Sequence, residues 1–160
     1  MNDSILSPSA QKVADALSQL KIPCQILELS DSTRTAPEAA QAVGCSVGAI
    51  VKSLIFRGKF TGIPILILVS GSNRVDTTLI EQMINEPILR AEPDFVREHT
   101  GFAIGGVPPV GFPKPVTTLI DGDLLQYDLV WAAAGTPHAV FSIHPEDLEK
   151  VTGGQIVQVY

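Results

Sequence analysis

The pattern of apolar residues predicts two neighbouring strands in the middle of the chain. Residues 64–69, PILILV, are apolar on both faces, which is typical of the central strand of a sheet. Residues 50–56, IVKSLIF, are apolar apart from Lys52 and Ser53. The segment RGKFTG between these two runs favours a hairpin. Further strands are predicted over residues 22–29, 116–120, 129–134, 139–143 and 155–160.

Helical spacing predicts helices between several of these strands. Val13 and Leu17 share one face of an expected helix over residues 7–20. Thr35 and Glu38 have the spacing of a capping box, which gives Thr35 a structural role at the start of a short Ala-rich helix. Helices inserted between strands indicate an α/β or α+β fold, a single domain over residues 1–160 with a mixed sheet. Further helices are expected over residues 76–84, 93–100 and 145–151.

Composition and charge narrow the class of protein. The chain is 45% hydrophobic and 18% charged, which is typical of a folded domain with a sizeable core. The formal net charge of −6 argues against the broad basic surface of a DNA-binding protein, so any contact with nucleic acid should be small and local. No apolar run is long enough for a membrane span, and the N-terminus lacks a leader pattern. We therefore expect a cytoplasmic protein without DNA or membrane partners.

Neither metal chemistry nor classical nucleophilic catalysis finds a matching motif. Cys24 and Cys45 have no CxxC spacing, and the three histidines have no zinc-binding spacing, so we expect no metal and no cofactor. A GxSxG elbow is missing, and His138 is interpreted as a surface or turn residue. Asp121 and Asp123 flank a glycine between two predicted strands, which is first of all turn chemistry.

Lys52 stands out because its neighbours are apolar. Alternation places it on the same face as Leu54 and Phe56, so its stem should leave an apolar surface. A buried and unpaired ammonium costs several kcal/mol, so the head should reach water or an anion. A snorkelling lysine and a protective charge on an edge strand are the simpler structural explanations.

Residues 101–115 form a second unusual segment. The sequence GFAIGGVPPVGFPKP contains four glycines and four prolines, which together give a stiff, shaped loop. It is longer than the ~4–6 residues of most connections, although a plain connector is also rich in these residues. The small residues at 132–135 end a predicted strand and would let a ligand or another backbone approach closely.

Three segments in this order resemble the signature of the YbaK and prolyl-tRNA-synthetase editing-domain family. They are IVKSLIF at residues 50–56, IGGVPPVG at residues 104–111, and Ala134-Gly135 at a strand end. The similarity extends over nearly the whole chain. The resemblance implies a compact domain whose mixed, partly barrel-like sheet has about six to seven strands with helices around it.

The same resemblance implies a free-standing trans-editing aminoacyl-tRNA deacylase. Such an enzyme hydrolyses the ester between a wrong amino acid and the terminal ribose of a tRNA. Lys52 matches the functional lysine of the family and is the implied catalytic residue, while main-chain N–H groups near Gly105, Gly106 or Gly135 would bind the carbonyl oxygen. The implied substrate-binding residues are Thr35, Gly105, Gly106, Val107, Pro108, Pro109, Gly111 and Gly135.

Several alternatives stay open from the sequence. Ser53 and the segment 107–109 differ from other branches of the family, so alanine, cysteine, serine and threonine are all candidate amino acids, with tRNA-Pro among the carriers. The acceptor end of the tRNA would be gripped locally, and a synthetase partner and the oligomeric state stay open. A non-catalytic module that binds a tRNA end, a nucleotide or a synthetase, and a small-molecule-binding domain, are the competing interpretations. Candidate cations at the rim are Arg57, Lys59, Arg74 and Lys114.

Overall fold

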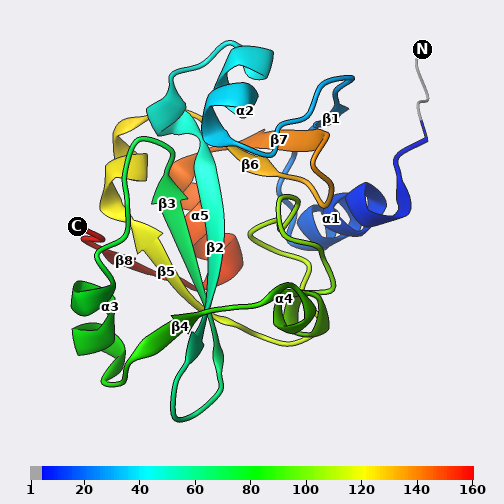
Figure 1. Cartoon of the computed structure of the whole chain (residues 1–160). Coiled ribbons are helices and arrows are strands. Elements are labelled where there is room, and N and C mark those ends of the chain that lie inside the picture. Colours follow the sequence, from blue (N-terminus) through cyan, green and yellow to red (C-terminus); the bar gives the residue numbers. More distant parts are fainter. Residues whose placement is uncertain (1–4) are drawn as a thin grey trace.

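A doubly apolar strand forms the middle of the protein, as the sequence predicts. In the computed structural model, which describes residues 5–160, β3 (Pro64–Ser70) is the central strand of a five-stranded sheet with the order β4-β2-β3-β5-β8 (Figure 1). The predicted hairpin with β2 is confirmed, and β5 and β8 extend the sheet by parallel pairing. The other strands are β2 (Val51–Gly58), β4 (Ile88–Arg90), β5 (Thr117–Asp121) and β8 (Gln155–Val157).

A second, antiparallel sheet has three strands in the order β1-β7-β6. These strands are β1 (Ile26–Glu28), β7 (Ala139–Ile143) and β6 (Val130–Ala133). An isolated bridge between Ile50 and Trp131 joins the start of β2 to β6. The α+β class with a mixed sheet is therefore confirmed. Residues 5–160 form eight strands in two sheets rather than six to seven in one, because β4 was not predicted and β1 and β6 form their strand ladders with β7.

The predicted helices are confirmed, and their capping follows the sequence. The Oγ1 atom of Thr35 accepts a hydrogen bond from the Glu38 N–H at 3.3 Å, and Asp76 caps the next helix in the same way. None of the helices in residues 5–160 is long and apolar enough to cross a bilayer. The helices are α1 (Pro8–Gln19), α2 (Ala36–Val43), α3 (Thr77–Ile84), α4 (Pro93–Thr100) and α5 (Pro145–Thr152), and the 3-10 turns are η1 (Val47–Ala49) and η2 (Gly122–Gln126).

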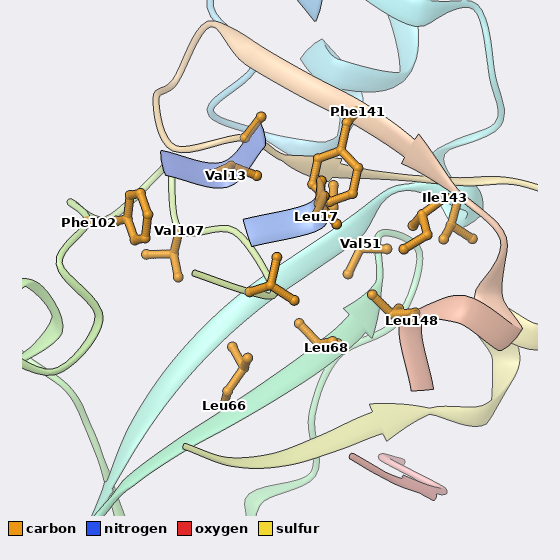
Figure 2. Close-up of a cluster of buried hydrophobic side chains, with 14 of the residues drawn as sticks. Val13, Leu17, Val51, Leu66, Leu68, Phe102, Val107, Phe141, Ile143 and Leu148 are labelled. Atoms are coloured by element: carbon orange, nitrogen blue, oxygen red, sulfur yellow. The ribbon is translucent and has the colours of Figure 1, made fainter. Parts of the chain in front are cut away.

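The five-stranded sheet separates two clusters of buried side chains. Leu66 and Leu68 of β3 pack with α1, α5 and the second sheet, and Figure 2 shows them on the same side as Leu17. Ile65 and Ile67, which alternate with them, pack on the opposite face against α3. All four of these β3 side chains are 0% exposed. The sheet is thus the middle layer between the two clusters.

Candidate functional site

A cavity of about 510 Å³ opens beside the first half of β2, on the edge opposite to the one that pairs with β3. Since β4 pairs only with residues 56–58, the start of β2 instead faces α2, β6 and the loop around Gly105. Apolar side chains from β2, β6 and β7 line part of the cavity, namely Ile50, Val51, Trp131, Ala132 and Val140. The two sheets and α2 therefore shape one pocket beside Lys52.

Lys52 is held at this cavity by a main-chain carbonyl group. Its Nζ atom donates a hydrogen bond to the oxygen of Asn73, in the connection between β3 and α3. Partial burial and the nearby Arg74 lower the pKa of Lys52, while Asp121 raises it by a smaller amount. Among residues 5–160, no carboxylate lies within 4.0 Å of this ammonium, because the one ion pair of that range joins two residues of α5. The charge is therefore fixed in place without being neutralised.

Three cationic side chains and no acidic ones line the cavity within the described chain. They are Arg34, Lys52 and Arg74, in a protein whose formal net charge is −6. Arg34 lies against the glycine loop, since a Cβ atom placed on Gly105 would be 3.2 Å from the Cγ atom of Arg34. Such a local concentration of positive charge suits a phosphate-bearing ligand.

Of the four rim cations expected from the sequence, only one lies at the cavity. Arg74 lines the cavity, whereas Arg57, Lys59 and Lys114 do not. The guanidinium of Arg57 lies 5.8 Å from the centre of the Phe95 ring, beyond the other end of β2. Arg34 was not predicted, because an exposed arginine in a polar turn carries no motif.

The glycine and proline loop contributes main-chain groups to the cavity wall. Gly105 and Val107 line it, and their N–H groups donate to no acceptor among the described residues. The N–H of Gly106 instead donates to Ala103 at 3.1 Å, and that of Gly135 donates to the Gly106 oxygen at 2.9 Å. Of the three predicted N–H donors, only that of Gly105 is therefore available to a ligand, together with that of Val107. The N–H groups of Gly106 and Gly135 already have main-chain acceptors.

Close packing explains why glycine occupies the two positions behind this wall. A Cβ atom on Gly106 would lie 2.7 Å from the Thr136 Cα atom, and one on Gly135 would lie 2.6 Å from the Ser9 oxygen. Glycine at these two positions therefore lets the loop pack against the β6–β7 turn, and lets that turn pack against α1. Neither residue lines the cavity. Pro108 and Pro109 are also buried outside the lining, and Gly111 lies at the surface away from it.

The comparisons with known proteins agree with this geometry. The family model described as the aminoacyl-tRNA editing domain matches residues 30–151. The chain belongs to the aminoacyl-tRNA editing domain family. The resemblance to YbaK-like editing domains that the sequence predicts is therefore confirmed.

Three relatives of this editing domain cover nearly its whole length. A solved structure described as a candidate trans-editing enzyme for prolyl tRNA synthetase is 50% identical, with a TM-score of 0.92 over 97% of this chain and 98% of that one. YwhH of Bacillus subtilis, which is uncharacterised, is 29% identical over 82% of this chain and 83% of its own length. EbsC of Enterococcus faecalis, described as a candidate Cys-tRNA(Pro)/Cys-tRNA(Cys) deacylase, is 26% identical over 88% of this chain and 87% of its own length.

The editing domain brings together four of the residues predicted from the sequence, since Thr35, Lys52, Gly105 and Val107 all line the cavity. Thr35 does so while it caps α2, with its hydroxyl 2.8 Å from a Glu38 carboxylate oxygen. An ammonium and free main-chain N–H groups around one cavity can stabilise negative charge that develops on an ester oxygen.

Two residues whose roles the sequence left open lie outside this cavity. His138 is exposed in the turn between β6 and β7. Cys45 is half-buried, and burial raises the pKa of its thiol, which disfavours the reactive thiolate. The structure therefore adds no nucleophile or metal ligand from these positions to the editing-domain cavity.

Proposed function

We propose that this editing domain is a trans-editing deacylase that hydrolyses the ester between a small amino acid and the terminal ribose of a tRNA, with tRNA-Pro as one carrier. The observation that carries the proposal is the cluster of Arg34, Lys52 and Arg74 around a partly apolar cavity in an acidic protein. The descriptions of EbsC and of the 50% identical structure support the same class of reaction and the link to proline tRNA.

The reaction can proceed by positioning and charge stabilisation. An aminoacyl ester is already activated, so a water molecule held beside it completes the reactants. The Lys52 ammonium would stabilise the negative charge that develops on the substrate, and the N–H groups of Gly105 and Val107, which have no acceptor among the described residues, would donate to the carbonyl oxygen. The two arginines bind the phosphates of the acceptor end.

We infer that the cavity sorts amino acids by the size of their side chains. Its volume of about 510 Å³ has to hold the terminal ribose together with the aminoacyl group. Each methylene group contributes only about 1–3 kcal/mol to discrimination in an apolar pocket. An editing enzyme that admits alanine, cysteine, serine or threonine and rejects larger side chains by size is consistent with this limit.

A panel of charged tRNAs tests the proposal. Wild-type protein should hydrolyse at least one of the alanyl, cysteinyl, seryl and threonyl esters of tRNA-Pro, and it should spare the prolyl ester. Lys52→Ala should lose about two to three orders of magnitude in rate, as is typical when one charge-stabilising group is removed. Lys150→Ala, at an exposed lysine of α5, should retain the wild-type rate.

Two results would count against the enzyme. Hydrolysis that survives unchanged in Lys52→Ala would remove the proposed role of this lysine. Binding of the charged tRNAs without hydrolysis of any ester would instead favour the non-catalytic module of the same fold.

A further inference from the structure

Asn73 connects the lysine of the cavity to two carboxylates. Its Nδ2 atom donates to Asp121 Oδ2 at 2.8 Å and to Asp123 Oδ2 at 2.9 Å. Its main-chain oxygen accepts the hydrogen bond from the Lys52 ammonium. One residue therefore uses its side chain for anchoring and its main chain for holding Lys52.

The first anchor, Asp121, is the buried last residue of β5. It is 1% exposed, and its carboxylate also accepts the Ser70 N–H at 3.0 Å and the Asp123 N–H at 2.9 Å. A buried carboxylate is costly unless several donors satisfy it, and these bonds provide them. Ser70 and Asp121 end the parallel strands β3 and β5, so both strands fix the position of the Asn73 side chain.

The second anchor, Asp123, lies at the surface and is oriented from the C-terminus. The Tyr160 hydroxyl donates to Asp123 Oδ2 at 2.7 Å. The hydrogen bonds from Asn73 and from Tyr160 lower the pKa of Asp123, so the carboxylate stays ionised at neutral pH. An ionised acceptor makes the stronger, charge-assisted hydrogen bond to the Asn73 amide.

We propose that Asn73 is the positioning residue of this site: clamped between Asp121 and Asp123, it fixes the carbonyl group that holds the Lys52 ammonium at the cavity. The proposal rests on the proposed function, because it explains how the reacting charge is aimed. A lysine side chain is flexible and loses about 2 kcal/mol of rotamer entropy when it is held in one conformation. A carbonyl group orients it without the competing negative charge that a carboxylate partner would bring to the substrate.

The charged groups around Lys52 determine how its pKa would change if the side chain were released from the Asn73 carbonyl group. Arg74 lies on the same connection, and Asp121 lies at the end of β5 behind Asn73. Arg34 lines the cavity on the side of the glycine loop. Burial and Arg74 outweigh Asp121, so a lysine that swings into solvent should recover a higher pKa.

Carbon-13 NMR of the lysine Cε atoms tests the clamp without any tRNA. In Asn73→Ala, the titration midpoint of Lys52 should rise above its midpoint in the wild type, because the released ammonium leaves the partly buried position beside Arg74. Ile80→Val is the matched control, because it removes a buried methyl group under α3 and costs about 0.5–1.5 kcal/mol in stability without touching the clamp. Its Lys52 titration should equal that of the wild type.

Kinetics provide the second readout. Asn73→Ala should lower kcat by roughly tenfold to a hundredfold with little change in KM, since a misplaced group affects the reacting geometry more than the grip on phosphate. Asp123→Ala removes the half-buried anchor and its hydrogen bond from Tyr160 but leaves the buried Asp121 in place. It should therefore fold even if Asn73→Ala does not, and it should raise the titration midpoint of Lys52 by a smaller amount.

The outcomes separate this inference from the proposed function. An unchanged Lys52 titration in Asn73→Ala, or in Asp123→Ala where Asn73→Ala fails to fold, would overturn the clamp. A shifted titration in a protein whose wild type hydrolyses no charged tRNA would support the clamp and refute the deacylase.

Discussion

Replacing Gly135 by alanine tests whether close packing of the glycine loop builds the cavity wall. Gly135 has φ +97, a left-handed conformation that costs a residue with a Cβ atom about 1–2 kcal/mol. The new Cβ would also lie 2.6 Å from the Ser9 oxygen and 2.8 Å from the Ser9 carbonyl carbon. These are main-chain atoms of α1 that cannot turn aside, and such overpacking costs about 1–3 kcal/mol. The free energy of unfolding should therefore fall by about 2–5 kcal/mol.

Gly44 provides the matched control. It also has a left-handed conformation, with φ +76 at the end of α2, but a Cβ atom there would meet nothing within 4 Å. In Gly44→Ala the free energy of unfolding should therefore fall only by the cost of the left-handed conformation, about 1–2 kcal/mol. The difference between the two variants isolates the contact with α1.

Urea denaturation measures both variants, with the single tryptophan, Trp131, as the fluorescent probe. Because the Gly135 N–H holds Gly106, and with it the loop that carries Gly105, Gly135→Ala should also lower kcat/KM by about tenfold or more. A loss of stability no larger in Gly135→Ala than in Gly44→Ala would refute the packing argument.

Three further results should follow from the charges. If the cavity cations contact about three phosphates, log kcat/KM should fall with log salt concentration at a slope of about −2, and Arg74→Gln, but not Arg97→Gln on α4, should reduce that slope by about 0.7. Lys52→Met should raise the free energy of unfolding at neutral pH by less than about 1 kcal/mol, because partial contact with solvent limits the gain. The gain should shrink as the pH rises towards 10.5, since the folded wild type then loses its unfavourable proton before the unfolded chain does. Hydrogen bonds from the Thr61 hydroxyl and N–H lower the pKa of Glu86. Their contribution to the free energy of unfolding should therefore be complete above pH 4.5 and should be lost as the pH falls through the lower pKa of the folded state. A chemical shift of the Thr61 amide that titrates at or above pH 4.5 in NMR would contradict this.

Local sequence patterns were sufficient to predict most of the helices and strands and the position of Lys52 on its strand. The apolar residues on both faces of β3 predicted a central strand, and alternation along β2 predicted that Lys52 shares a face with Leu54. Strand β4 was missed because its three residues present only Ile88 to the core, too short a pattern for periodicity to detect. The division into two sheets depends on pairing β1 with β7, which lie far apart in the sequence, and no local pattern encodes such a choice.

The chemical environment of the site was less predictable for a related reason. Lys52 is held by the main-chain oxygen of Asn73, and a backbone acceptor leaves no mark on the sequence. Asp121 and Asp123 form the expected turn at the start of η2, but their second role depends on Asn73 reaching them from the β3–α3 connection. Arg34 likewise lines the cavity beside the glycine loop, a neighbour that is about 70 residues away in the sequence.

Single-turnover hydrolysis of a short acceptor-stem RNA ending in CCA would show whether the Lys52 ammonium accelerates cleavage of an aminoacyl ester. The RNA would carry alanine, cysteine, serine or threonine as its ester, and wild-type protein would be compared with Lys52→Met, which retains most of the side-chain volume and removes the charge. The account predicts that the wild type accelerates hydrolysis of at least one ester and that Lys52→Met is slower by about a hundredfold or more. Equal rates for the two proteins, or no acceleration of any ester by the wild type, would contradict it.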